Sequence, residues 1–233
     1  GYDRLVSECR ERDSYHRHVL NDLVDKILAV STDVKDHFVQ WGISGEKIDV
    51  LHIGTKAAEV LTRRPKSTDN SVFTFGMLGF HSYLKGTDLV IRAFHRIQSD
   101  KIRLRLFGHV DRSFQGELAR YLSTDPRITF EGSYRLEDLN EILPKVDVVV
   151  VPPVIPDTAP QVVFEAFATG TPVLGAKIGG IPDFVQHGNN GLLFRAGDLN
   201  DLEQKMRDML KNPSLIARLS GRIRPMKSIS DHA

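Results

Sequence analysis

Residues 146–174 read VDVVVVPPVIPDTAPQVVFEAFATGTPVL and contain a complete strand–helix–strand pattern. The β-branched run at 146–151 is typical of a strand that is buried on both faces of a sheet. A helix is predicted over 160–169, because proline fits its first position and Gly170 fits its C-terminal stop. A second short strand follows at 172–174. Strands joined by a helix in this way are typical of a parallel sheet.

The same alternation extends in both directions from this unit. Further strands are predicted at 72–78, 102–107, 128–130 and 192–194. Helices are predicted at 87–97, 114–122, 136–143, 181–187 and 199–211. With right-handed crossovers this order predicts an α/β fold, a doubly wound, Rossmann-like parallel sheet. Such sheets bind ligands at the carboxyl ends of their strands, which directs attention to the loops after residues 78, 108, 132, 152 and 174.

The first seventy residues have a different pattern. A charged helix with a narrow apolar stripe is predicted at 3–24, and short strands at 26–30 and 48–53. Ser31 is a good N-cap for a helix between these strands. Residues 56–71 are polar and predict a linker or an exposed loop.

Composition excludes several classes of protein. The 233 residues carry 31 Lys and Arg against 30 Asp and Glu, a net charge of +1, which argues against a generally basic nucleic-acid binder. A single cysteine, Cys9, excludes a disulfide framework and a cysteine-based zinc cluster, and fits a reducing, cytoplasmic compartment. No apolar run is long enough for a transmembrane helix or a signal peptide. The chain begins with Gly1 rather than Met, so we expect it to start inside a longer protein.

The loop after the strand at 72–78 has a glycine at each end, Gly79 and Gly86, and Lys85 just before a predicted helix. Helix N-termini attract anions through free amides and the helix dipole, so a phosphate site is one interpretation. A solvated surface lysine is the other. The spacing matches neither a P-loop nor the G-x-G-x-x-G fingerprint of dinucleotide-binding proteins.

The loop at 152–160 contains four prolines and is predicted to be stiff. Asp157 stands just ahead of the following helix, where it either caps the helix or contacts a ligand. Glu165 lies inside that helix among apolar residues, so its carboxylate needs a partner, either a ligand or a neighbouring group. Gly179 and Gly180 allow a close backbone approach to a ligand or an ordinary turn.

Three segments in this order resemble the donor-binding half of retaining GT-B glycosyltransferases of the family 4 type: 160–173 (PQVVFEAFATGTPV), 179–183 (GGIPD) and 187–194 (HGNNGLLF). Lys85-Gly86 and Gly132 match further positions of that family. The resemblance covers about residues 26–225. It implies the C-terminal GT-B domain, a nucleoside-diphosphate sugar as donor substrate, and neither a cofactor nor an obligatory metal.

The resemblance also implies roles for single residues. Glu165 would bind the ribose hydroxyls, and Asp157 the hydroxyls of the donor sugar, where the family has the longer Glu. Lys85 would hold the diphosphate and, with Asp157, act in catalysis. The family's usual Arg is replaced by Phe80, and His81 is expected to substitute for it weakly. The donor site would also include Gly79, Gly132, Thr158, Ala159 and Pro160.

The expected organisation follows from this resemblance. Residues 1–50 would be an incomplete α/β remnant of the N-terminal acceptor domain together with the segment that crosses into the second half. Residues 51–71 would be a linker, 72–225 the nucleotide-sugar-binding domain, and 226–233 a truncated C-terminal tail. The predicted function is transfer of a hexose to a hydroxyl acceptor with retention, without activity in the isolated chain. The expected partners are the donor and the acceptor domain, with a membrane-associated parent allowed. A non-catalytic nucleotide-sugar-binding module and a nicotinamide oxidoreductase are the alternatives.

Overall fold

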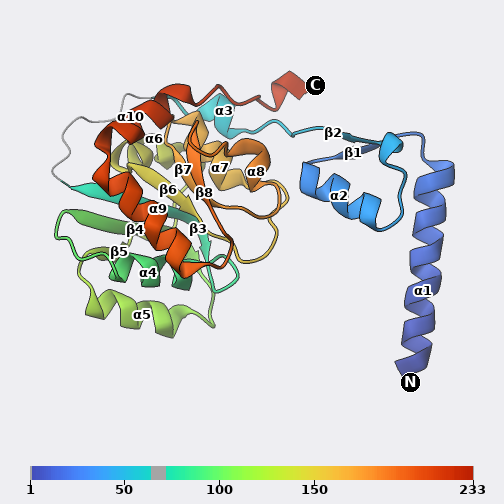
Figure 1. Cartoon of the computed structure of the whole chain (residues 1–233), viewed down its shortest axis with the longest axis horizontal. Helices are drawn as coiled ribbons and strands as arrows, with labels where there is room; N and C mark the ends of the chain where they lie inside the picture. The colour runs from blue at the N-terminus through green and yellow to red at the C-terminus, as the bar shows by residue number, and fades with distance from the viewer. Residues whose placement is uncertain (1, 64–71, 233) are drawn as a thin grey trace. The chain divides into compact units, whose positions relative to one another are not determined.

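The structure is a computed structural model that describes residues 2–63 and 72–232. The chain divides into two compact units, Gly1–His52 and Ile53–Ala233 (Figure 1). Each unit has its own sheet, which pairs only strands from that unit among the described residues. The two units are therefore described separately.

The large unit contains a six-stranded sheet in the order β5-β4-β3-β6-β7-β8, with every neighbouring pair parallel. Its strands are β3 Phe73–His81, β4 Ile102–Val110, β5 Ile128–Phe130, β6 Val148–Val151, β7 Val173–Ala176 and β8 Gly191–Phe194. The strand order reverses between β3 and β6, which makes this pair the topological switch point. The predicted doubly wound parallel sheet is confirmed.

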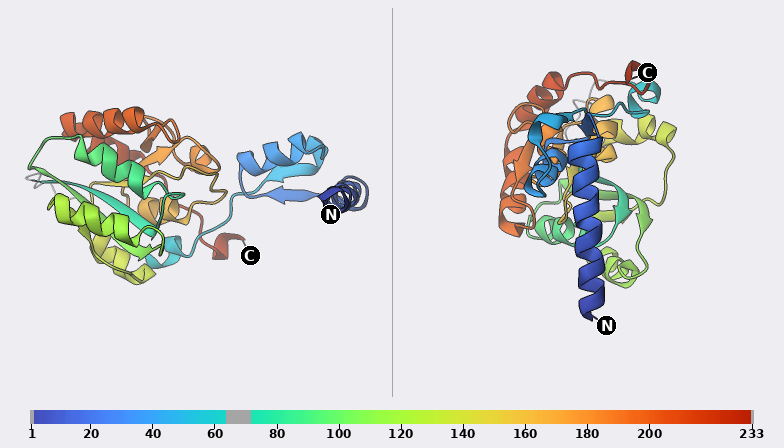
Figure 2. Two further views of the ribbon diagram at one scale, coloured as in Figure 1. Left: turned by 90° about the horizontal axis from the view of Figure 1, so that it is seen from below. Right: turned by 90° about the vertical axis from the view of Figure 1, so that its right-hand side faces the viewer.

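Helices cover both faces of this sheet (Figure 2). One face packs against α4 Thr87–His95, α5 Gln115–Thr124, α9 Leu199–Lys211 and α10 Pro213–Arg222. The other packs against α3 Ala57–Val60, α6 Leu139–Ile142, α7 Gln161–Ala168 and α8 Ile181–Phe184. Short 3-10 turns at Leu136–Asp138 and Leu143–Lys145 flank α6, and another at Ser230–His232 lies near the C-terminus. Two core clusters result, one on each face of the sheet.

Strand β6 shows why its sequence is apolar throughout. Val148 and Val150 belong to one core cluster, whereas Val149 and Val151 belong to the other. Alternate side chains of a strand point to opposite faces, so both faces here require apolar residues. The helix after this strand begins at Gln161, with Pro160 at its N-cap position.

Strand β3 is longer than predicted. It continues through residues 79–81, which pair with residues 108–110 of β4. The glycine at 79 suggests a loop, and its φ of 97° is not that of an extended strand, but pairing with β4 continues through it to His81. The true loop between β3 and α4 is therefore shorter and begins at Ser82.

The predicted linker 51–71 is not a simple exposed loop. It contains α3, and its Ala57 and Leu61 are buried in the core of the large unit. The amide of Thr55 donates to the carbonyl of Lys227, and Ser230 donates to Glu59. The segment 53–63 and the tail at 226–232 thus belong to the same compact unit. A helix of four residues, such as α3, is too short to show a periodic pattern in the sequence. The rest of the predicted linker, residues 64–71, lies outside the described residues.

The small unit comprises α1 Tyr2–His18, a π-helical turn Val19–Leu23, β1 Ile27–Ala29, α2 Thr32–Gln40, a 3-10 turn Gly45–Lys47 and β2 Ile48–Val50. The strands β1 and β2 are parallel, and Ser31 accepts a hydrogen bond from the amide of Val34 as the predicted N-cap. Ala29, Ile43 and Ile48 form its buried cluster. Strand β2 ends three residues earlier than predicted. Among the described helices of the whole chain, none is long and apolar enough to cross a membrane.

Candidate functional site

A cavity of about 290 Å³ opens at the carboxyl ends of β3 and β6, at the switch point of the sheet. Its walls come from the end of β3, the loop between β3 and α4, the proline-rich loop after β6, and the first turn of α7. Of the predicted site residues, this cavity brings together Gly79, Lys85, Asp157, Ala159 and Pro160. The lining also contains Phe80, at the position where the resemblance implies an arginine.

The loop between β3 and α4 holds Lys85 in place. The amide of Lys85 donates to Ser82 Oγ at 3.2 Å, and the amide of Ser82 donates to Thr87 Oγ1 at 3.2 Å. Gly86 has a φ of 73°, and a Cβ atom there would lie 1.9 Å from the carbonyl oxygen of Pro152. The residue that follows Lys85 must therefore be glycine, which ties this loop against the loop after β6.

Lys85 and Asp157 form an ion pair, with 2.8 Å between Nζ and Oδ2. Asp157 does not stand at the N-cap position of α7, which is occupied by Pro160 three residues later. Its carbonyl oxygen accepts a hydrogen bond of 2.8 Å from the amide of Gly180. A Cβ atom at Gly179 would lie 2.5 Å from the same oxygen. The close backbone approach that Gly179 and Gly180 allow is thus made to the backbone of Asp157.

Glu165 lies on α7, half-buried, and accepts a 3.5 Å hydrogen bond from the hydroxyl of Tyr134. Burial raises the pKa of the Glu165 carboxyl, although the bond from Tyr134 opposes this change. Burial and the nearby carboxylate also raise the pKa of Tyr134. The sequence gives only a weak indication that Tyr134 belongs to the site. It lies two residues after Gly132, but a tyrosine in this position is more typical of a packing residue.

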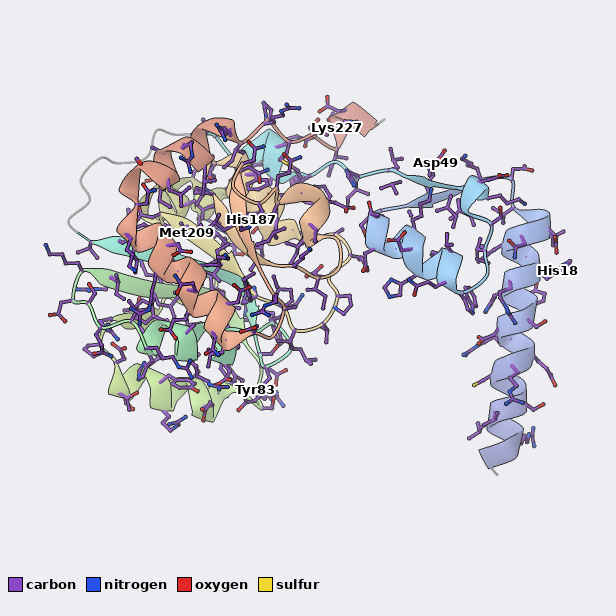
Figure 3. All side chains as sticks on the ribbon, in the orientation of Figure 1. His18, Asp49, Tyr83, His187, Met209 and Lys227 are labelled. Atoms are coloured by element: carbon purple, nitrogen blue, oxygen red, sulfur yellow. The ribbon has the colours of Figure 1, made fainter. Side chains whose placement is uncertain are left out.

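The remaining predicted site residues lie outside the cavity lining. Gly132 follows β5, and its carbonyl oxygen accepts a 2.7 Å hydrogen bond from the amide of Gly108. Thr158 and Glu165 are also outside the lining, although Thr158 is adjacent to Asp157 and Glu165 lies along the helix that begins at the cavity. Tyr83, which Figure 3 labels, presents a half-exposed ring in the loop between β3 and α4.

His81 is not in the cavity and cannot replace the missing arginine, contrary to the sequence-based expectation. Neighbouring residues of a strand point to opposite faces, so Phe80 lines the cavity while His81 is fully buried. His81 Nε2 lies 3.2 Å from the carbonyl oxygen of Phe107, where the neutral ring can donate. Burial lowers the pKa of His81 to about 4.

The buried imidazole predicts a pH dependence of stability. The unfolded chain binds a proton at His81 near its ordinary pKa of 6.5, whereas the folded chain binds it only near pH 4. The free energy of unfolding is therefore unaffected by protonation of His81 above pH 6.5. As the pH falls toward 4, protonation of the unfolded chain at His81 lowers this free energy by up to about 3 kcal/mol. Urea unfolding across this range should show a smaller decline for His81→Gln than for the wild type. His109→Gln, at an exposed histidine on β4, is the control. An unchanged decline in His81→Gln would contradict the assignment.

The described residues contain no group of three or more His, Cys, Asp or Glu side chains arranged to hold a metal ion. The charges that the described part of the chain brings to the cavity are those of Lys85 and Asp157. The site thus combines one cation, one carboxylate and the free amides of a helix N-terminus.

Comparison with known proteins gives the family. A family model described as "Glycosyl transferases group 1" matches residues 69–212. The chain belongs to this family. The match covers most of the large unit and includes Lys85, Asp157 and Glu165. It favours the predicted glycosyltransferase over the oxidoreductase alternative.

Curated glycosyltransferases align with the chain over different lengths. The D-inositol 3-phosphate glycosyltransferase of Mycolicibacterium smegmatis is 28% identical over 233 residues, covering 93% of this chain and 50% of that protein. The sulfoquinovosyl transferase SQD2 of Arabidopsis thaliana is 34% identical over 103 residues, covering 43% of this chain and 20% of that protein. The chain thus spans about half the length of the relatives that it matches over most of its own length.

Solved structures of glycosyltransferases share the fold. HepE of Anabaena in complex with UDP-glucose has a TM-score of 0.75 at 21% identity, covering 91% of this chain and 61% of that one. The C-terminal domain of the group 1 protein LpcC of Francisella tularensis has a TM-score of 0.62 at 17% identity, covering 71% of this chain and 92% of that one. The chain therefore has the fold of the C-terminal half of GT-B glycosyltransferases.

Proposed function

We propose that the chain is the nucleotide-sugar-binding half of a retaining glycosyltransferase, which transfers a hexose from a nucleoside-diphosphate sugar to a hydroxyl acceptor. The observation that carries the proposal is the cavity at the switch point, where Lys85 and Asp157 meet at the N-terminus of α7. A cation beside free helix amides suits a diphosphate, and a carboxylate beside it suits sugar hydroxyls. UDP-glucose bound to a protein of similar fold supports this ligand class.

In this proposal each part of the donor has its own contact. The diphosphate lies at Lys85 and the first amides of α7, near Ala159 and Pro160. The sugar hydroxyls donate to Asp157, and the ribose diol donates to Glu165 further along the same helix. The nucleobase lies toward Gly132. Transfer breaks the bond between the anomeric carbon and the phosphate oxygen and forms a bond to the acceptor oxygen. The acceptor hydroxyl releases its proton to the solvent, and the nucleoside diphosphate leaves with the electron pair of the broken carbon–oxygen bond and thus with an additional negative charge.

Phe80 favours a second candidate, a module that binds nucleotide sugars without catalysing transfer. The phenyl ring occupies the cavity wall where the resemblance implies a guanidinium. An aromatic ring cannot donate the paired hydrogen bonds that an arginine gives to a phosphate. The site would then bind the donor but stabilise the departing diphosphate less well.

Calorimetric titration of the 233-residue chain tests the proposal. UDP, UDP-glucose, GDP and GDP-mannose are compared, with NADH as a negative control. We expect at least one nucleoside diphosphate and its sugar to bind, and little transfer to a hydroxyl acceptor, because the chain spans about half of its relatives. Binding of none of these, or of NADH alone, would contradict the proposed function. Robust transfer by the chain alone would contradict its assignment as a donor-binding half.

Glu165→Gln should weaken nucleotide binding by roughly 10- to 100-fold and leave the melting temperature nearly unchanged. A charge-assisted hydrogen bond contributes about 1.5–3 kcal/mol, and the nearly isosteric amide loses that assistance. Tyr134→Phe is the matched control, because it removes the hydroxyl that contacts Glu165 but keeps the ring. We expect a smaller effect from that variant. An unchanged affinity with a much lower melting temperature in Glu165→Gln would indicate a structural role instead.

A further inference from the structure

The charged side chains that the described residues bring to the cavity balance each other. Among the described residues that line it, Lys85 and Asp157 are the charged ones, and their signs are opposite. Their charged atoms are in contact at 2.8 Å, with 42% and 26% of the two side chains exposed. An incoming diphosphate therefore meets a lysine whose charge is already balanced.

Both partners of this pair extend from fixed backbone positions. The loop that carries Lys85 is held against Pro152 by Gly86, where there is no room for a Cβ atom. The loop that carries Asp157 is held in the same way by Gly179, and by the bond from the amide of Gly180. The ion pair can therefore open by rotation of its side chains while both loops stay in place.

We propose that Asp157 competes with the donor's phosphates for Lys85 and thereby makes the site prefer an intact nucleoside-diphosphate sugar over the free nucleoside diphosphate. This inference rests on the proposed function. A phosphate that takes Lys85 leaves the Asp157 carboxylate without its cation, close to a second anion. When a sugar is present, its hydroxyls donate to Asp157 and compensate for the lost partner.

Free nucleoside diphosphate offers no such compensation. It lacks the hexose whose hydroxyls would face Asp157, and breaking the anomeric carbon–oxygen bond has left an additional negative charge on its terminal phosphate. Asp157 then faces a more strongly charged anion without a hydrogen-bond donor. Return of Asp157 to Lys85 would favour release of this product, so the same carboxylate binds the donor's sugar and helps to expel the spent nucleotide.

Asp157→Asn tests whether the charge of Asp157 weakens binding of the free nucleoside diphosphate more than binding of its sugar. The amide keeps the shape of the side chain but removes its charge. We expect the affinity for UDP to rise about tenfold, which corresponds to about 1.4 kcal/mol. The affinity for UDP-glucose should rise less or fall, so that the preference for the sugar-bearing ligand decreases. Asp138→Asn is the matched control, since Asp138 pairs with Arg135 at 3.1 Å and lies outside the cavity lining. It should change neither affinity.

The affinities of the wild type and the variants are measured by calorimetry with UDP and UDP-glucose, or with GDP and GDP-mannose if these bind better. The inference is overturned if Asp157→Asn binds the nucleoside diphosphate no better than the wild type, or if both ligands gain equally. Asp157→Ser provides a second test if the first variant has a lowered melting temperature. Failure of the wild type to bind any of these nucleotides would instead overturn the proposed function, and is seen before any variant is compared.

Discussion

Replacing Lys85 with methionine should lower the affinity for a nucleoside diphosphate by about two orders of magnitude. A hydrogen bond to a charged group contributes about 1.5–3 kcal/mol, and methionine keeps most of the side-chain volume without the charge. The variant also leaves Asp157 in the cavity without its cation, where it repels the phosphates. Calorimetric titration with the nucleoside diphosphate that binds the wild type measures the loss.

Lys101→Met is the matched control for this prediction. Lys101 is exposed, and its carbonyl oxygen accepts from the amide of Phe73 at the opposite end of β3. The control should bind as the wild type does. The double variant Lys85→Met/Asp157→Asn should recover part of the lost affinity, because the repelling carboxylate is gone. Equal affinities for Lys85→Met and Lys101→Met would exclude Lys85 as the diphosphate ligand.

Replacing Gly86 with alanine should destabilise the fold by about 3 kcal/mol or more and weaken nucleotide binding. Gly86 has a φ of 73°, a conformation that costs an alanine about 1–2 kcal/mol. The added methyl would also lie 1.9 Å from the carbonyl oxygen of Pro152, so the two loops must separate. That movement would break the 3.0 Å hydrogen bond from the amide of Val154 to the carbonyl of Leu84.

Gly188→Ala is the control that distinguishes the cost of the steric clash with Pro152 from the cost of a positive φ. Gly188 has a φ of 76°, but a Cβ atom there would have no neighbour within 4 Å. We expect this control to lose only about 1–2 kcal/mol and to bind nucleotide normally. Urea unfolding and calorimetry on both variants give the comparison. Equal losses of stability would show that contact with the loop after β6 contributes nothing.

The parallel sheet could be predicted because its strands are marked locally. The β-branched run of β6 and the proline and glycine around α7 indicate both elements without any tertiary information. The end of β3 could not be read in this way, since a glycine at 79 is typical of a loop and only the pairing with β4 extends the strand. The four-residue helix α3 is also too short to show a period.

The alternation of side chains along β3 explains why the prediction for His81 was wrong. Once the strand extends to residue 81, alternation places Phe80 and His81 on opposite faces, and the prediction that His81 faces a phosphate fails. The pairing of Lys85 with Asp157 joins residues that are 72 positions apart, and local sequence carries no signal for such a contact. The bond from Tyr134 to Glu165 is of the same kind. Residue types at the site were predictable, but their partners were not.

A crystal structure of the chain with the nucleoside diphosphate that binds best in titration would show whether the cavity at the switch point is the donor site. We expect the diphosphate at the carboxyl ends of β3 and β6, with a phosphate oxygen about 3 Å from Lys85 Nζ and the ribose hydroxyls at Glu165. The 2.8 Å contact between Lys85 and Asp157 should then be broken. A nucleotide bound elsewhere, or bound here with that ion pair intact, would contradict this expectation.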